Sequence, residues 1–151
     1  MNTKTEELNK KIARQSIDAI TKGDYDLLEQ ISDIDTYQLH YPSYLKPLDY
    51  DEAEELSDNF NLAFPDMKVT IENQIAEGDY VVTRMIYQGT HKNEYRGIAA
   101  TGKKVKISAM TIQYIVEGKI TEEWTEIDTL GMMQQIGALP YLDTIFSKEK
   151  A

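Results

Sequence analysis

Two glycine-centred turns in the second half of the sequence constrain the fold more than any other feature. They are Glu77-Gly78-Asp79 and Glu117-Gly118-Lys119, and each separates two segments in which apolar and polar residues alternate. The four segments cover residues 67–78, 80–91, 104–117 and 119–128. Alternation is typical of strands, and a short turn with glycine between two such segments is typical of a hairpin. The sequence therefore predicts two long β-hairpins between residues 67 and 128.

The first 65 residues show helical spacing instead. In segment 3–22, apolar residues recur every three or four positions, Thr3 and Glu6 have the spacing of a capping box, and Gly23 follows the last turn. Further elements are predicted by similar signals: a helix over 25–31, a strand over 36–41, a helix over 49–64, a helix from 128 or 129 to 135, and one more turn after 141.

Helices that precede a run of antiparallel strands are typical of the α+β class. We expect residues 1–151 to form one domain, with a curved antiparallel sheet and helices packed on its concave face. Long strands bent around a few helices leave a cavity between the two layers. The mouth of such a cavity is the default place for a small-molecule ligand.

Composition excludes several classes of function. The chain has 16 basic and 26 acidic residues, a net charge of −10, so we expect no nucleic-acid partner. No apolar run is long enough to cross a bilayer, and the charged N-terminus lacks a secretory signal, so we expect a cytoplasmic protein without membrane contact. Without cysteine, with two distant histidines and without a phosphate-binding motif, the sequence indicates no metal and no nucleotide site.

A series of short motifs runs through the second half of the chain. The motifs, in order, are A-F-P-D at 63–66, A-E-G-D-Y-V at 76–81, G-T-H at 89–91, T-G-K at 101–103, E-G-K-I at 117–120, E-W at 123–124, L-G at 130–131 and Q-Q-I-G-A-L-P at 134–140. Together, in this order and with these gaps, they resemble the SnoaL-like polyketide cyclase or ester cyclase family. That family has the cone fold of the nuclear transport factor two-like superfamily.

The resemblance implies a cofactor-independent enzyme. SnoaL-type cyclases close a ring of an aromatic polyketide by an aldol condensation, in which a base removes a proton beside an ester and donors stabilise the enolate. In an alignment without gaps through G-K-I, the position of the cyclases' catalytic aspartate falls on Thr125 and that of its partner histidine on Thr111. Neither threonine is a general base at neutral pH. The resemblance therefore implies the fold of the family, but the catalytic aspartate and histidine of the cyclases are not present at these two positions.

Three residues are candidates for acid–base chemistry. His91 ends a long strand and is either a donor at the cavity rim or a structural histidine that holds the next loop. Glu123 shares strand parity with Thr125, so it is either a carboxylate in the pocket or a solvated charge at the strand end. Asp128 stands at the start of a helix, where an N-cap explains it without chemistry.

The candidates for substrate binding lie on neighbouring strands. Thr111, Gln113 and Thr125 are expected on the pocket face, and Trp124 offers ring area and a donor, although its parity opposes that of Glu123. Arg84 lies in the middle of a strand, where it would meet an acidic ligand group or pair with Glu123 or Asp128.

Two further clusters are aromatic or apolar. His40 lies near Tyr37, Tyr41 and Tyr44, which either pack at the surface or form the rim of the pocket. The strand face opposite Thr111 is itself apolar (Met110, Ile112, Tyr114), which indicates a homodimer through the sheet. Two functions remain open: a small acid–base enzyme of the SnoaL-like type, and a non-catalytic module that binds a small molecule or a protein partner.

Overall fold

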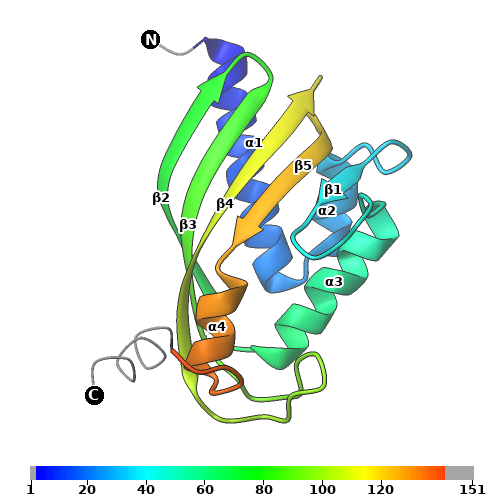
Figure 1. Cartoon of the computed structure of the whole chain (residues 1–151). Coiled ribbons are helices and arrows are strands. Elements are labelled where there is room, and N and C mark those ends of the chain that lie inside the picture. Colours follow the sequence, from blue (N-terminus) through cyan, green and yellow to red (C-terminus); the bar gives the residue numbers. More distant parts are fainter. Residues whose placement is uncertain (1–2, 142–151) are drawn as a thin grey trace.

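The computed structural model describes residues 3–141 and contains, in that range, four helices and five strands (Figure 1). In chain order they are α1 (Lys4–Lys22), α2 (Tyr25–Ile31), β1 (Gln38–His40), α3 (Tyr50–Ala63), β2 (Lys68–Glu77), β3 (Tyr80–Thr90), β4 (Lys104–Val116), β5 (Lys119–Ile127) and α4 (Thr129–Gln135). Both predicted hairpins and all four predicted helices are present within a few residues of the expected bounds. The turn predicted after residue 141 lies outside the described residues.

Local signals at its two ends account for helix α1. The Thr3 hydroxyl accepts from the backbone N–H of Glu6, and the Glu6 carboxylate accepts from the backbone N–H of Thr3, which completes the capping box. Gly23 ends the helix in the left-handed conformation, with φ of 67°. The buried face of α1 includes Ile12 and Ile17, which pack on the sheet.

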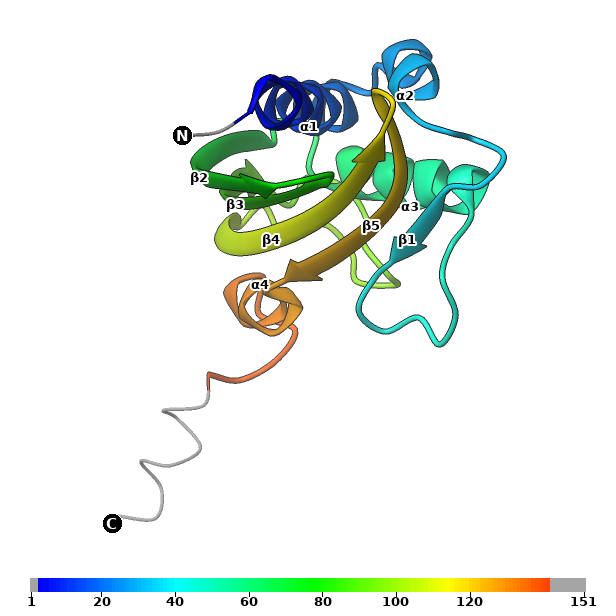
Figure 2. The same cartoon turned by 90° about the horizontal axis from the view of Figure 1, so that it is seen from above.

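The five strands form one sheet in the order β1-β5-β4-β3-β2. The pairs β2–β3, β3–β4 and β4–β5 are antiparallel, as predicted, whereas β1 runs parallel to β5 at the sheet edge. The long connection through α3 and three strands allows this parallel pairing. Seen from above, the sheet curves around α1 and α3, which lie on its concave side (Figure 2). The fold is therefore α+β with a mixed, curved sheet.

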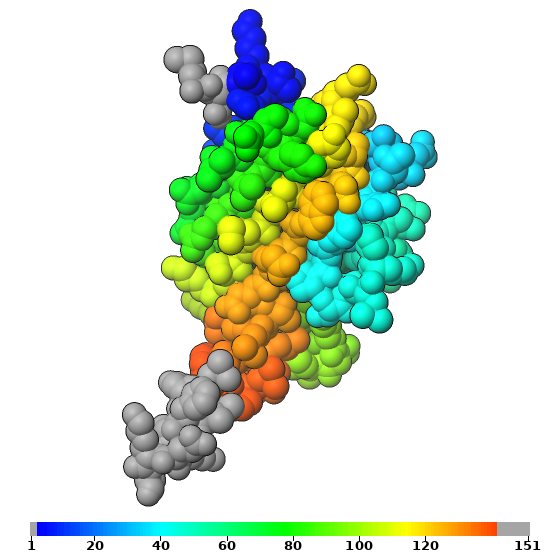
Figure 3. Space-filling view, turned by 45° about the horizontal axis from the view of Figure 1, so that its top comes forward, coloured from blue at the N-terminus to red at the C-terminus, as the bar shows by residue number. Residues whose placement is uncertain are grey.

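Strand β4 shows how the two faces of the sheet differ. Its burial alternates strictly: Val105, Ile107, Ala109, Thr111 and Gln113 are buried on the concave face, and the residues between them are exposed or half-buried on the convex face. In Figure 3 the strands reach the surface side by side, and in this view no described helix covers them. The concave face is therefore where a site can form.

Helix α4 closes the lower end of the fold in Figure 1. Its residue Met132, with Ile136 just beyond the helix, packs in one apolar cluster with Phe64, Met67 and Ile107. A second cluster at the other end joins Ile12 to Val81 and Ile115. The cavity lies between these two clusters. None of the described helices has the length and apolar character needed to span a membrane.

Candidate functional site

A cavity of about 100 Å³ lies between the helices α1 and α3 and the concave face of the sheet. We call it the main cavity. Helix α1 contributes Ile20, helix α3 contributes Phe60, and strands β4 and β5 contribute Thr111 and Glu123. A space of this size holds several water molecules or one small organic molecule.

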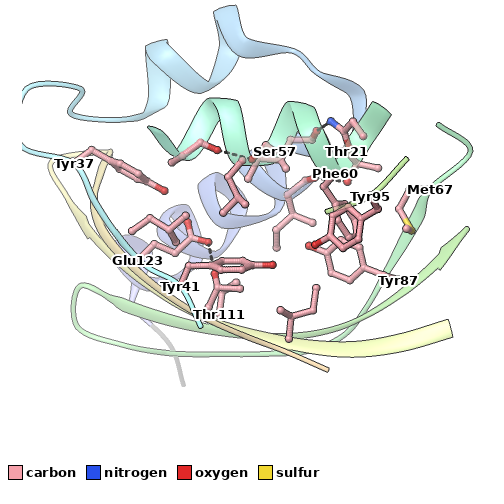
Figure 4. Close-up of a pocket in the computed structure, with 18 residues that line it drawn as sticks. Thr21, Tyr37, Tyr41, Ser57, Phe60, Met67, Tyr87, Tyr95, Thr111 and Glu123 are labelled. Carbon is pink, nitrogen blue, oxygen red and sulfur yellow. Dashed lines mark hydrogen bonds between the residues drawn. The ribbon is translucent and has the colours of Figure 1, made fainter. Parts of the chain in front are cut away.

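The wall of the main cavity combines aliphatic side chains with five aromatic rings. In Figure 4 Tyr37 and Glu123 lie at one end, and Phe60, Tyr87 and Tyr95 lie at the other. No lysine, arginine or histidine among residues 3–141 lines this space. The described wall of the cavity therefore presents apolar side chains, ring faces and hydroxyl groups, together with one carboxyl group.

That carboxyl group belongs to Glu123, which strand β5 places on the concave face. The residue is only 6% exposed, and burial raises the pKa of its side chain above the ordinary value of 4.5. Hydrogen bonds from Gln113, Thr125 and Tyr37 favour the ionised form and act in the opposite direction. Burial has the larger effect, so the proton is held more tightly than by a solvent-exposed glutamate.

Neighbouring side chains fix the position of the Glu123 carboxyl group. The Gln113 amide nitrogen donates to Oε2 of Glu123 at 2.9 Å and to the hydroxyl of Ser16 at 3.0 Å. The Thr125 hydroxyl donates to Oε1 of Glu123 at 3.0 Å. Gln113 therefore links the carboxyl group to helix α1, and Thr125 holds it from the same strand.

Thr111 differs from Thr125 in having no partner for its hydroxyl. The side chain lines the main cavity and is 5% exposed, and its buried Oγ1 has no hydrogen-bond partner among the described residues. A buried hydroxyl without a partner costs free energy. A ligand that bonds to Thr111 would remove this cost.

Two tyrosines add further donors. Tyr41 and Tyr87 line the main cavity, and burial raises the pKa of both phenols above the ordinary value. For Tyr87 the charge of Glu123 raises the pKa further. Both hydroxyls are thus protonated at neutral pH and can donate to an oxygen of a bound molecule.

His91 lies outside the main cavity. It is fully buried, its ring stacks on Phe64 with 5.3 Å between the centroids, and its Nδ1 lies 3.0 Å from the hydroxyl of Thr101. Its backbone bonds to Lys103 and Gly102, so it closes the loop between β3 and β4. These contacts agree with the structural interpretation of this histidine.

Three other predicted site residues are also directed away from the main cavity. Arg84 is on the convex face and forms an ion pair with Glu72, not with Glu123 or Asp128, because its strand position has the opposite parity. Asp128 accepts from the backbone N–H of Gly131 at 2.8 Å and caps α4. Trp124 stacks on His40 on the convex side, 5.1 Å between centroids.

The sequence analysis did not select Phe60, Tyr87 and Tyr95 for the site. Parity alone places Tyr87 on the concave face with Thr111, since Tyr87 has the same strand parity as Thr83, the partner of Thr111 in the antiparallel pair β3–β4. Of the aromatic cluster around His40, Tyr37 and Tyr41 line the cavity. Among residues 3–141 no group of three or more His, Cys, Asp or Glu side chains could hold a metal ion.

Solved structures with the same fold include a SnoaL-like protein of Jannaschia sp. CCS1, with 21% identity and a TM-score of 0.84 over 93% of this chain and 99% of that one. AclR of Streptomyces galilaeus, a candidate hydroxylase, is 21% identical, with a TM-score of 0.80 over 89% of this chain and 99% of that one. IdmH of Streptomyces antibioticus, a candidate polyketide cyclase, is 25% identical, with a TM-score of 0.78 over 85% and 98%.

No curated protein matches the sequence significantly. The family model of the SnoaL-like polyketide cyclases matches residues 10–136, which include every described helix and strand except the first turns of α1. The chain therefore belongs to the SnoaL-like polyketide cyclase family.

Proposed function

We propose that this protein is a cofactor-independent acid–base enzyme that acts on a small, uncharged molecule with a ring or an ester group. The observation that carries the proposal is the side chain of Glu123. It borders the main cavity, its pKa is raised by burial, and its position is fixed by Gln113 and Thr125. A general base works best when its pKa lies near the working pH.

The proposed step is the removal of a proton from a carbon beside a carbonyl group. The ionised Glu123 takes the proton, the electron pair of the C–H bond moves into the carbonyl, and an enolate forms. Thr111 and Tyr87 then donate hydrogen bonds to the enolate oxygen, which is where the new charge develops. The protonated Glu123 afterwards returns its proton to carbon or oxygen, and the group is restored.

The wall of the main cavity supports an uncharged substrate. Since none of the described lining residues is a lysine, arginine or histidine, an anionic group would be buried without a counter-ion. The ring faces of Phe60, Tyr87 and Tyr95 suit a flat or cyclic molecule. In this proposal His91, Arg84 and Asp128 have structural roles, and Gln113 positions Glu123.

A non-catalytic binding module is the second candidate. It is favoured by the two threonines, Thr111 and Thr125, at the positions where the resemblance to the cyclases would require a histidine and an aspartate. In that case the main cavity would only bind a molecule, and Glu123 would supply a hydrogen bond to it.

We also propose that the protein is a homodimer through the convex face of the sheet. Met110 is 49% and Ile112 40% exposed there, beside the half-buried ring of Trp124. Exposed apolar side chains on adjacent strands are typical of an interface. The surface between β4 and β5 would then be covered by a second copy.

Deuterium incorporation tests the proposed function. Cyclohexanone, a small uncharged ring ketone, is incubated with the protein in D₂O, and the label beside the carbonyl is measured by NMR. We expect the wild type to accelerate incorporation and Glu123→Gln to reduce that acceleration by about a hundredfold or more. Glu126→Gln is the matched control, since Glu126 is an exposed residue on the convex face of the same strand. Binding of cyclohexanone without any acceleration would favour the binding module.

A further inference from the structure

Glu123 also lines a second, smaller cavity that adjoins the main cavity. This rear cavity has a volume of about 30 Å³ and lies among α1, α2, α3 and the start of β5. It shares five lining residues with the main cavity: Ile20, Tyr37, Ala53, Ser57 and Glu123. Glu123 therefore borders both cavities.

Six of the residues that line the rear cavity carry a hydroxyl group, among a larger apolar surface. They are Ser16, Ser32, Ser57, Tyr25, Tyr37 and Tyr50. The buried hydroxyl of Tyr50 has no hydrogen-bond partner among the described residues. A water molecule needs ~10–15 Å³ of such space and several polar partners, so this cavity accommodates about two water molecules. An unpartnered Tyr50 hydroxyl is a site for one of them.

Beyond Tyr50 the rear cavity meets an open surface hollow. We call it the acidic cleft, because Asp26, Glu29, Asp35, Asp51 and Glu54 line it. Tyr25, Tyr50 and Glu54 line both the acidic cleft and the rear cavity. The three hollows thus follow one another in space, with Glu123 between the first two and Tyr50 and Glu54 between the second and the third.

Glu54 is suited to exchange protons at the outer end. Partial burial, with the charges of Asp58, Asp51 and Glu29, raises the pKa of its carboxyl group. Burial raises the pKa of Tyr50 to about 12, and the charges of Glu54, Glu29 and Asp51 add to this. Tyr50 is therefore neutral and can accept a proton on its oxygen while it releases its own. At the inner end, the titratable neighbours of Glu123 are Tyr37 and Tyr87.

We propose that the rear cavity is a hydrated proton-exchange compartment, through which Tyr50 and Glu54 connect Glu123 to solvent while a ligand fills the main cavity. The proposal rests on the proposed function, since it presupposes that Glu123 gains or loses a proton during turnover. A ligand in the main cavity closes the direct route to Glu123. In this proposal the route at the rear stays open, because Tyr25, Tyr50 and Glu54 line the rear cavity and not that ligand space.

Each transfer along this route conserves charge and atoms. The proton leaves protonated Glu123 for a water molecule in the rear cavity, and that water passes a proton to the oxygen of Tyr50. Tyr50 releases its own hydroxyl proton towards the Glu54 carboxylate, directly or through the second water. Glu54 then gives the proton to solvent in the acidic cleft. No bond to carbon changes and no co-reactant is needed.

The experiment follows the infrared band of the protonated Glu123 carboxyl group, which is assigned by its loss in Glu123→Gln. Protein saturated with phenol, an uncharged ring compound that occupies the main cavity, is transferred into D₂O, and the isotopic shift of the band is timed. We expect Tyr50→Phe and Glu54→Gln each to slow this exchange by about a hundredfold. Tyr44→Phe and Glu55→Gln are the matched controls, because Tyr44 and Glu55 are exposed and line neither the rear cavity nor the acidic cleft.

The possible results separate the two proposals. Slow exchange in Tyr50→Phe and Glu54→Gln, with normal exchange in both controls, supports the compartment. Equal exchange in all variants, with the Glu123 band present, overturns the compartment and leaves the proposed function standing. If no Glu123 band exists near neutral pH, the carboxyl group is ionised and holds no proton to exchange, which overturns the compartment and leaves the ionised base of the proposed function standing. Glu54 lies at the surface, so Glu54→Gln keeps the test valid even if Tyr50→Phe alters packing.

Discussion

Thr111 on β4 and Thr125 on β5 are paired across the two strands, and both side chains line the main cavity. By resemblance, these positions correspond to the histidine and the aspartate that perform ring closure in the cyclases. Here the two threonines have different roles, since Thr125 donates to Glu123 and Thr111 keeps a hydroxyl without a partner. The carboxyl group that lines the main cavity lies two residues before Thr125 on β5, at the position paired with Gln113.

The hydroxyl of Thr111 is expected to matter for ligand binding and not for stability. Thr111→Val removes a buried hydroxyl that has no partner, so the free energy of unfolding should stay equal or rise by about 1 kcal/mol. Binding of phenol should weaken about tenfold, which equals about 1.4 kcal/mol. Chemical denaturation and calorimetric titration measure the two effects.

Thr83 provides the matched control, because it is the buried partner of Thr111 on β3 and its hydroxyl accepts from Gln74 at 3.0 Å. Thr83→Val should lower the free energy of unfolding by about 1 kcal/mol, because the hydrogen bond from Gln74 is lost. A loss of stability in Thr111→Val as large as in Thr83→Val would mean that Thr111 has an internal partner.

The raised pKa of Glu123 makes stability depend on pH. Between pH 4.5 and the raised pKa the folded protein binds more protons at this site than the unfolded chain, so the contribution of Glu123 to stability falls as pH rises through that range. Glu123→Gln lacks this dependence. The free energy of unfolding of the variant relative to the wild type should therefore increase as pH rises from 4.5 to the raised pKa. A difference that stays constant above pH 4.5 and decreases as pH rises towards 4.5 would show a lowered pKa.

Replacement of Arg84 should change neither the affinity of the main cavity for a ligand nor the free energy of unfolding by much. Its side chain is 46% exposed and pairs with Glu72, so Arg84→Met should change the free energy of unfolding by less than about 1 kcal/mol. The affinity for phenol should be the same as in the wild type, as measured by titration. A tenfold loss of affinity would show that Arg84 takes part in ligand binding.

The exposed apolar side chains on the convex face of the sheet predict a dimer. Ile112→Glu introduces a charge at the centre of this face and should convert the proposed dimer to a monomer in sedimentation velocity experiments. Leu62→Glu is the control, since Leu62 is exposed on α3, away from the sheet. If the wild type sediments as a monomer at micromolar concentration, the convex face has another role.

Much of the fold could be predicted because its signals are local. The turns at Gly78 and Gly118 and the caps at Thr3 and Asp49 depend on residues within a few positions, and all four occur as expected. Alternation then assigned Thr111, Gln113 and Glu123 to one face, and the structure brings these three together.

The features that could not be predicted from the sequence depend on contacts between distant segments. Glu72 is the extra residue of a β-bulge between Ile71 and Asn73, which strict alternation does not predict, so the partner of Arg84 was not found from the sequence. The parallel pairing of β1 with β5 brings Tyr37 to Glu123 from a segment far away in the chain. The orientation of His91 towards Phe64 depends on how the loop between β3 and β4 folds back over α3.

The most direct test of Glu123 as a poised acid–base group is a ¹³C NMR titration of its side-chain carboxyl carbon, with Glu123→Gln used for assignment. We predict a single titration step at a pKa clearly above 4.5, because burial outweighs the hydrogen bonds from Gln113, Thr125 and Tyr37. A titration step at or below 4.5 would show that the hydrogen bonds outweigh burial, which would contradict the account of Glu123 as a carboxyl group whose pKa is raised towards the working pH.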